Sequence, residues 1–446
     1  MNILSPQVAR GPVETPRAWL RQLADTAISA VHPDTLLPDR LPEPPLGRTV
    51  VVGAGKAAAA MAAALERAWK IQQPNAPLEG LVVTRYGHGV QGQGLQGQNS
   101  ECRRIEVLEA SHPMPDDLSE QAARRMLAAV TDLGEDDLVI ALVSGGGSAL
   151  MTLPAPGVSL AEKQAINQAL LRSGAPIREI NTVRRHLSAI KGGRLGAAAH
   201  PARVLTWLIS DVPGDEASLV ASGPTLPDAT MPDDALAILE RHAIEVSEDV
   251  RHCLEGRNIA PRRGDAGFAR DESEILARAR DALSAGQAAA EHDGIEVRLL
   301  GDDLEGEARE LGRAQGRMAL SAQDGLEQPL LILSGGETSV TVRGDGRGGR
   351  NVEYLLGLFD ALQGAEGIHA LAIDTDGIDG SEDNAGALFA PEDWARARTR
   401  GLDPVEYLSC NDAYTFFQAL DDLIITGPTR TNVNDFRAIL VLPRTP

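Results

Sequence analysis

Arg48-Thr-Val-Val-Val-Gly-Ala-Gly-Lys56 is the stretch that decides the fold, and the Ala-rich segment 57–70 follows it directly. The apolar run predicts a buried strand, the glycines predict a tight turn, and segment 57–70 predicts a helix. This order is typical of an α/β sheet, in which ligands approach the turns that follow the strands. Gly53 and Gly55 let the backbone approach a ligand closely, and Lys56 adds a compact positive charge. We therefore expect these three residues to bind an anion.

The same alternation of short apolar runs and helical segments continues along the chain. Further strands are expected at residues 81–84, 104–108, 138–143, 204–209, 296–300, 330–333, 339–342, 369–373, 423–425 and 438–441. Helices are expected at residues 15–30, 160–173 and 182–191, with a helical, charged stretch over 232–286. Because 446 residues exceed one ordinary core, we predict two α/β domains, residues 1–240 and 241–446, the first with a Rossmann-like, mostly parallel sheet.

The overall composition narrows the class of ligand. The net charge is −21, which argues against binding nucleic acid or an anionic membrane surface, so an anionic ligand needs a local basic pocket. The three Cys and nine His form no CxxC pair and no HExxH motif, so neither a disulfide framework nor a zinc site is predicted. No signal-peptide pattern or membrane-spanning apolar run is evident, and we expect a soluble, cytoplasmic protein.

A second glycine turn, Ser144-Gly-Gly-Gly-Ser148, follows the strand expected at 138–143. Its backbone N–H groups are suited to cradle a phosphate or a carboxylate, so Ser144, Gly145, Gly146 and Ser148 are binding candidates. A plain tight turn is the alternative interpretation.

Basic residues gather in the predicted helix 182–191. At 3.6 residues per turn, Arg184, Ser188 and Lys191 share one face, which makes Arg184 and Lys191 candidates for binding an anion in this acidic chain. A solvated helix face would produce the same pattern.

The second half of the chain adds an arginine and a pair of acids. Arg350 and Asn351 follow two glycines where a helix is expected to begin, and an arginine there can neutralise the charge of a transferring phosphoryl group. Asp374 and Asp376 end the strand expected at 369–373. Two carboxylates that are two residues apart on a turn can converge on one Mg²⁺, or one of them can serve as a base.

The first glycine turn also permits a different cofactor. Gly53-Ala-Gly-Lys-Ala-Ala58 loosely matches the dinucleotide-binding pattern G-x-G-x-x-A. The next strand ends Val83-Thr-Arg85 instead of in an acid, which weakens an NAD site, although an arginine could suit NADP.

Eleven motifs in order, between Gly53 and Asp435, together resemble the type 2 glycerate kinases, which join an N-terminal glycerate kinase domain to a C-terminal MOFRL domain. The motifs are Gly53-Ala-Gly-Lys56-Ala, Ser111-His-Pro-Met-Pro-Asp116, Ser144-Gly-Gly-Gly-Ser-Ala-Leu150, Glu179-Ile-Asn-Thr-Val-Arg184, Lys191-Gly-Gly-Arg-Leu195, Ser210-Asp-Val-Pro-Gly-Asp215, Ser222-Gly-Pro-Thr225, Ser334-Gly-Gly-Glu-Thr338, Gly348-Gly-Arg-Asn351, Thr375-Asp-Gly-Ile-Asp-Gly380 and the segment from Thr429 to Asp435.

The resemblance implies phosphorylation of glycerate at the 2-hydroxyl by ATP with Mg²⁺, in an active site between the two domains. It implies Lys56 and Arg350 as the principal cations, with Asp374 or Asp376 as base or metal ligand. Further binding residues that it implies are Asp211, Gly335, Glu337, Asn351, Asn432 and Asp435. The chain departs from the family pattern at Arg430, where Gly is usual, and at Cys410.

Two other functions remain open from the sequence. Relatives are often labelled hydroxypyruvate reductase, so an NAD(P)-dependent reductase that uses Gly53 to Ala58 is the first. A non-catalytic sensor of sugar acids is the second. In each case the expected partner is a small sugar acid, with no nucleic acid and no membrane, and a homodimer is compatible with the sequence.

Overall fold

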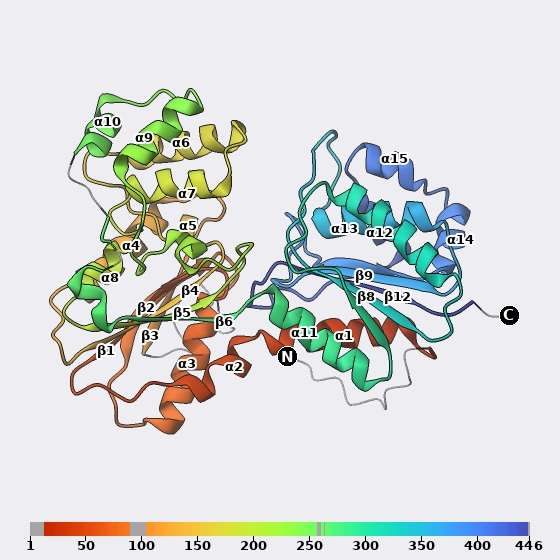
Figure 1. The fold of residues 1–446 in the computed structure, drawn as a ribbon, viewed down its shortest axis with the longest axis horizontal. Coiled ribbons are helices and arrows are strands. Elements are labelled where there is room, and N and C mark those ends of the chain that lie inside the picture. The colour runs from red at the N-terminus through yellow and green to blue at the C-terminus, as the bar shows by residue number, and fades with distance from the viewer. Residues whose placement is uncertain (1–12, 90–103, 257–259, 263, 445–446) are drawn as a thin grey trace. The chain divides into compact units, whose positions relative to one another are not determined.

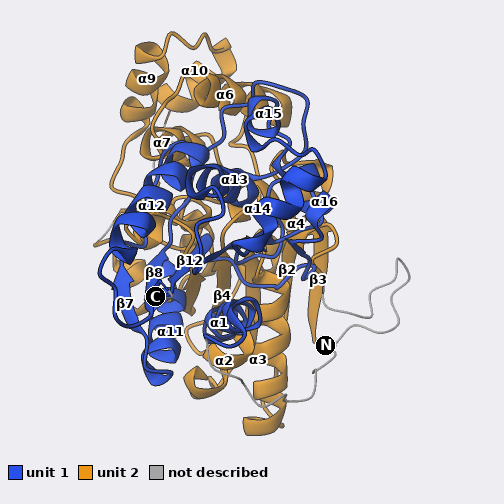
Figure 2. Cartoon of the chain, turned by 90° about the vertical axis from the view of Figure 1, so that its right-hand side faces the viewer, with its two compact units in different colours: residues 1–32, 277–446 blue, residues 33–276 orange. Residues whose placement is uncertain are grey.

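The computed structural model describes residues 13–89, 104–256, 260–262 and 264–444. The chain forms two compact units, which Figure 2 colours separately. Unit 2 comprises Pro33–Leu276, whereas unit 1 comprises Ala277–Pro446 together with the N-terminal residues up to His32. The boundary that we predicted at residue 240 differs from this division. Residue 240 lies inside helix α9 (Pro232–Arg241), and the prediction assigned the first helix to the N-terminal domain, whereas it belongs to unit 1 with the second half of the chain.

Unit 2 contains a six-stranded sheet in the order β3-β2-β1-β4-β5-β6. The strands are β1 (Thr49–Ala54), β2 (Glu79–Arg85), β3 (Ile105–Ala110), β4 (Leu138–Ser144), β5 (Arg203–Ile209) and β6 (Glu272–Ala277). Strands β1 to β5 pair in parallel, so their carboxyl ends and the turns that follow them share one edge. The sequence predicted these five strands but missed β6, whose first three residues are exposed and whose charged sequence Glu-Ser-Glu gives no apolar run.

Two groups of helices belong to unit 2 (Figure 1). The sheet is accompanied by α3 (Ala58–Gln72), α4 (Asp117–Val130), α5 (Gly147–Leu150) and α8 (Arg194–Ala199). A separate group consists of α6 (Leu160–Arg172), α7 (Ile177–His186), α9 and α10 (Glu248–Glu255), and it has its own apolar core around Leu170 and Val183. The short helices are α2 (Pro33–Leu36), η1 (Pro38–Arg40), η2 (Ala217–Ser222) and η3 (Ala266–Arg270).

Unit 1 contains a mixed sheet in the order β11-β10-β9-β12-β8-β7. The strands are β7 (Glu296–Leu299), β8 (Leu330–Ser334), β9 (Ile368–Asp374), β10 (Gly386–Phe389), β11 (Leu423–Ile424) and β12 (Asp435–Val441). Strand β12 runs antiparallel to both of its neighbours, so it begins where β8 and β9 end. The strand predicted at 339–342 is wrong, because Ser339 makes only an isolated bridge to Glu307, and the short β10 was missed.

Helices cover both faces of the sheet of unit 1 (Figure 1). Helices α1 (Pro16–Ala30) and α11 (Ala279–His292) lie on one face, and α12 (Ala308–Gln323) and α13 (Arg350–Leu362) lie on the other. The remaining helices are α14 (Glu392–Thr399), α15 (Pro404–Ser409) and α16 (Ala413–Leu420). A Cβ on Gly312 would stand 2.0 Å from the carbonyl oxygen of Tyr354, so α12 and α13 pack too closely for any larger residue there.

Helix α1 belongs to unit 1 for two reasons. Trp19, Leu20 and Leu23 are buried at helical spacing, which gives the helix one apolar face. In addition, Arg17 forms ion pairs with the buried acids Asp393 and Asp422 of the same unit. Across the described ranges, every helix falls short of the length and apolar character that crossing a bilayer requires.

Candidate functional site

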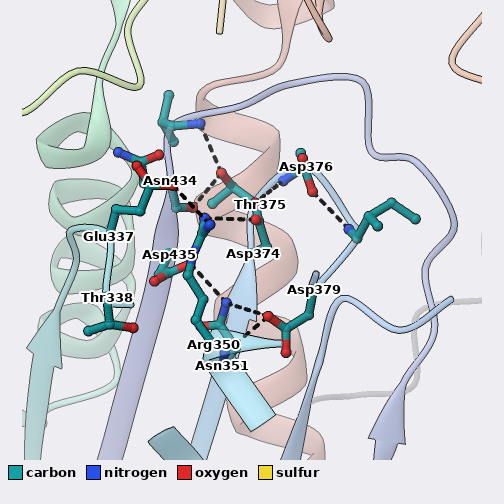
Figure 3. A network of polar contacts seen from close by, with 12 residues as sticks. Glu337, Thr338, Arg350, Asn351, Asp374, Thr375, Asp376, Asp379, Asn434 and Asp435 are labelled. Atoms are coloured by element: carbon teal, nitrogen blue, oxygen red, sulfur yellow. Dashed lines mark hydrogen bonds and ion pairs between the residues drawn. The ribbon is translucent and has the colours of Figure 1, made fainter. Parts of the chain in front are cut away.

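The strand ends of unit 1 bring an arginine and three acids together (Figure 3). Asp374 is the last residue of β9, and Asp435, the first residue of β12, pairs with it in the register of the sheet. Glu337 lies in the turn after β8, and Arg350 is the first residue of α13. The glycine turn and the antiparallel course of β12 therefore place all four side chains at one edge.

Arg350 uses each of its nitrogens for a different carboxylate. Nε donates to Asp435 at 2.8 Å, Nη1 donates to Glu337 at 2.9 Å and Nη2 donates to Asp374 at 2.9 Å. Burial lowers the pKa of Arg350, but the attraction of the three acids outweighs it and raises that pKa well above the ordinary value. The guanidinium is therefore permanently charged and held in one orientation.

Asp379 anchors the start of α13 and is a residue that the sequence analysis did not nominate. Its Oδ1 accepts the backbone N–H of Asn351 at 3.0 Å, and its Oδ2 accepts that of Val352 at 2.9 Å. Burial raises the pKa of Asp379 to about 6, although these two N–H groups oppose the shift. The Asn351 amide also donates to Asp435 at 2.8 Å. Asp379 therefore helps to fix the first turn of α13, to which Arg350 and Asn351 belong. The available signal was its place as the third carboxylate of the run that begins with Asp374 at the end of β9.

Asp374 ends β9, and Asp376 lies two residues further on, in the turn that follows the strand. Oδ1 of Asp374 accepts the backbone N–H of Asp376 at 3.0 Å, and Oδ1 of Asp376 accepts that of Ile378 at 2.8 Å. Within the part of the chain that the structure describes, no group of three or more His, Cys, Asp and Glu side chains has the arrangement of a metal site. Mg²⁺ bound to phosphates needs only one or two protein carboxylates, so this turn still fits such an ion.

The loop that leads into β12 packs against the same turn. Thr429 donates its backbone N–H to the carbonyl oxygen of Asp376 at 2.9 Å, and Asn432 and Asn434 are buried. Arg430 has a φ of +69°, in the left-handed region that favours glycine. This backbone explains why glycine suits the position at which the chain carries Arg430.

In unit 2 the two glycine turns bond to each other. Lys56 donates its backbone N–H to Gly145 at 2.8 Å, and Ala57 donates to the Ser144 hydroxyl at 3.0 Å. A Cβ on Gly53 would stand 2.2 Å from the carbonyl oxygen of Leu142. One on Gly55 would stand 2.1 Å from the Ser144 hydroxyl. The contacts of these two glycines and Ser144 thus join adjacent strands, and Lys56, which is partly exposed, is the better candidate for a ligand contact.

The second turn gathers further polar groups. A Cβ on Gly146 would stand 3.2 Å from the His112 ring and 3.3 Å from Cγ of Lys56, so both side chains flank this glycine. His112 follows β3 by two residues, and its position after a predicted strand was the signal that the sequence offered. The Ser148 hydroxyl lies 2.8 Å from that of Ser222. Asp211 likewise follows β5 by two residues and is partly exposed.

The prediction that Arg184 and Lys191 share one face of a helix over residues 182–191 is wrong. Helix α7 ends at His186, and the turn that follows carries Gly192 and Gly193 at φ of +61° and +81°. Lys191 consequently lies outside the helix and is buried, with its Nζ donating to the carbonyl oxygen of Met151. Arg184 and Lys191 are still close enough that Arg184 contributes to lowering the pKa of Lys191.

The remaining predicted residue, Gly335, directly follows β8. Its carbonyl oxygen accepts Nη1 of the buried Arg437 at 2.8 Å. Arg437 in turn forms an ion pair with Asp435, so this glycine supports the acids that hold Arg350.

Two α/β units with polar and charged residues gathered at the strand ends define an α/β enzyme. A family model for a domain of unknown function, DUF4147, matches residues 19–255, and the MOFRL family model matches residues 330–435. The chain belongs to the glycerate kinase family. This assignment rests on the relatives and the solved structure that match nearly the whole chain.

A protein of Agrobacterium vitis that carries the provisional name hydroxypyruvate reductase is 52% identical, over 95% of this chain and 94% of its own length. The D-glycerate 2-kinase of Thermotoga maritima is 39% identical, over 93% of this chain and 95% of its own length. A crystal structure of glycerate kinase from Thermotoga maritima matches 96% of this chain and 100% of its own, with a TM-score of 0.85 and 37% identity.

Proposed function

We propose that this protein is a glycerate 2-kinase, which transfers the γ-phosphoryl group of ATP to the 2-hydroxyl of glycerate. The observation that carries the proposal is the guanidinium of Arg350, held by Glu337, Asp374 and Asp435 at the start of α13. Catalysis of phosphoryl transfer depends on positioning and on charge stabilisation, because the protein contributes little covalent chemistry. A rigidly oriented cation is suited to that task. The kinship with a D-glycerate 2-kinase supports glycerate as the substrate.

Each candidate residue then has a role. Lys56 and Arg350 stabilise the negative charge of the transferring group. We assign the role of base to Asp376 and that of metal ligand to Asp374, whose carboxylate Arg350 and a backbone N–H hold in one orientation. Mg²⁺, when bound with ATP, neutralises phosphate charge, and Asp374 is the carboxylate that we propose for it.

The reductase is the second candidate, and the name of the Agrobacterium vitis relative favours it. In a dinucleotide site the second glycine of the pattern lets the pyrophosphate approach the backbone. In this chain the hydroxyl and the carbonyl oxygen of Ser144 fill the space into which a Cβ on Gly55 would project. The packing of Gly55 against Ser144 therefore argues against a pyrophosphate at this glycine.

Two assays separate the candidate functions. Purified protein should release ADP only when D-glycerate, ATP and Mg²⁺ are all present, and phosphorus NMR should show 2-phosphoglycerate as the product. Consumption of NADH with hydroxypyruvate, without release of ADP, would replace the kinase by the reductase. Tight binding of glycerate without turnover of any nucleotide would indicate the sensor.

A further inference from the structure

Unit 2 contains three closely spaced cations with no acid beside them. Lys163 on α6 donates from Nζ to the carbonyl oxygens of Arg184 at 2.9 Å and Leu187 at 2.6 Å. Lys191 donates to the carbonyl oxygen of Met151. Among the described residues, no carboxylate forms an ion pair with Lys163, Arg184 or Lys191. We call these three residues the cation cluster.

Burial and mutual repulsion act strongly on this cluster. Burial lowers the pKa of Arg184 to about 10, and burial together with Arg184 lowers that of Lys191 to about 7. Burial and the charges of Lys191, Arg184 and Arg194 hold the pKa of Lys163 well below its ordinary value. Asp228, a carboxylate that lies beside Gly192, forms ion pairs with Arg185 and His186 instead. An uncompensated buried charge is strongly destabilising, so these lysines lose their protons readily, and an anion from outside the chain would stabilise their charged forms.

The orientation of Arg184 identifies the kind of anion. Its Nε donates to the amide oxygen of Asn167 at 2.7 Å, which fixes the plane of the guanidinium. Neither Nη atom has a hydrogen-bond partner among the residues that the structure describes. Arg184 is also the one partly exposed member of the cluster, since Lys163 and Lys191 are buried. Two parallel donors on a fixed plane match the two oxygens of a carboxylate.

The cluster adjoins the second glycine turn of the same unit. Asn181 lies one helical turn before Arg184 on α7 and accepts the Ser222 hydroxyl at 3.0 Å. Ser222 bonds to Ser148, and Met151, which Lys191 contacts, directly follows the short helix that Ser148 belongs to. An anion on Arg184 would therefore lie near the polar groups of this turn.

We propose that Arg184 binds the carboxylate of a small 2-hydroxy acid, and that Lys163 and Lys191 supply the positive potential behind it. The inference rests on the proposed function for the identity of the acid. It extends that function by assigning the carboxylate to one residue and by adding Lys163 and Asn167, which the sequence analysis did not nominate.

Binding measurements test this assignment without turnover. Calorimetry gives the dissociation constants of D-glycerate, of its neutral amide glyceramide and of ATP with Mg²⁺. The proteins are the wild type, Arg184→Met and Arg184→Lys. Arg178→Met is the matched control, because Arg178 lies on the same helix in an exposed ion pair with Glu216 at 2.9 Å.

We expect Arg184→Met to weaken glycerate binding by about ten- to a hundredfold, the loss typical of a charged hydrogen-bonded contact. Arg184→Lys should lose less, because it keeps the charge but offers no fork. Binding of glyceramide and ATP should change less than about twofold, and Arg178→Met should resemble the wild type.

Three outcomes would overturn the proposal: an equal loss for glyceramide, a loss confined to ATP, or unchanged glycerate binding. If Arg184→Met does not fold, wild-type affinity for glycerate in Arg184→Lys would also overturn it. The fate of the kinase proposal is separate. If glycerate or another 2-hydroxy acid binds through Arg184 while no ADP forms in any assay, the carboxylate site stands and the kinase proposal falls.

Discussion

Arg350 in unit 1 and Arg184 in unit 2 both lie where turns and helices meet at a polar site, yet their surroundings are opposite. Three carboxylates surround Arg350, which raises its pKa, whereas cations surround Arg184, and burial lowers its pKa. A cation that the protein itself neutralises is already in place before a ligand arrives, and it costs little reorganisation during a reaction. A cation without a partner gains most when an anion binds. We therefore expect replacement of Arg350 to lower mainly kcat, and replacement of Arg184 to raise mainly the KM for the acid.

Replacing Arg350 should give the largest effect, because it removes the cation that the three acids of unit 1 neutralise. Arg350→Met leaves Asp374 buried without its cation and removes one of the two cations of Asp435, which should lower the free energy of unfolding by about 3–5 kcal/mol. Arg350→Lys should keep nucleotide binding but lose turnover by about tenfold to a thousandfold, because it cannot reach three carboxylates at once. Urea denaturation and steady-state kinetics measure the two effects.

Arg347→Met is the control for Arg350. Arg347 pairs with Glu382, and its side chain is 52% exposed, so its removal should cost less than about 1 kcal/mol. Equal destabilisation by both variants would show that the three acids around Arg350 contribute no more to stability than an exposed ion pair does.

Lys191→Met tests the cation cluster of unit 2 through the pH dependence of stability. In the folded chain the pKa of Lys191 is about 7, against an ordinary value of 10.5. Between these values the unfolded chain holds a proton that the folded chain lacks, so the stability of the wild type should rise with pH across this window. At pH 6, below that pKa, most of the buried charge is present. There, Lys191→Met should be more stable than the wild type, by an amount on the order of a few kcal/mol.

The measurement for Lys191 is urea denaturation from pH 6 to 10 in the absence of carboxylic acids. Lys70→Met, at an exposed position on α3, should keep the slope of the wild type. A Lys191→Met protein that is less stable than the wild type at every pH would show that the contact with Met151 outweighs the repulsion in the cluster.

The fold was predictable from the sequence wherever burial leaves a local pattern. Strands β1 and β4 are buried along their whole length and read as apolar runs. Strand β6 is half exposed and β10 has only four residues, so neither gives such a run. No local pattern could place α1 in unit 1, because its ion pairs join residues about 400 positions apart.

The candidate site was predictable as a set of residues but less so as geometry. Arg350, Asp374 and Asp435 meet because β12 runs antiparallel beside β9, a pairing that spacing alone does not reveal. Arg184 and Lys191 lie close enough for their charges to interact, but not on the helix face that the sequence predicted. Helix α7 ends at His186, before Lys191, so the two charges interact across a turn and not along a shared helix face.

Lys56→Ala should have a smaller effect than either change in the charge clusters, and it should appear in kinetics instead of stability. Lys56 is partly exposed and flanks Gly146, so we expect its replacement to disturb the packing of the unit little. We expect kcat/KM to fall by about a hundredfold, or about 2.7 kcal/mol of transition-state stabilisation, with a nearly unchanged melting temperature. A protein that loses its fold instead would show that Lys56 is structural.

Arg430→Gly should give the smallest effect, and it sharpens the comparison by asking whether the balanced site of unit 1 also stores backbone strain. Arg430 has a φ of +69° in the loop that bonds to Asp376 through Thr429. A left-handed conformation costs a residue with a Cβ about 1–2 kcal/mol, part of which is offset because glycine gains entropy in the unfolded chain. The substitution should therefore raise the free energy of unfolding by about 1 kcal/mol or less. Arg430→Ala is the matched control, because it removes the same charge and keeps the Cβ. If Arg430→Ala stabilises the protein as much as Arg430→Gly, the gain comes from losing the arginine side chain, and the backbone of this loop is not strained.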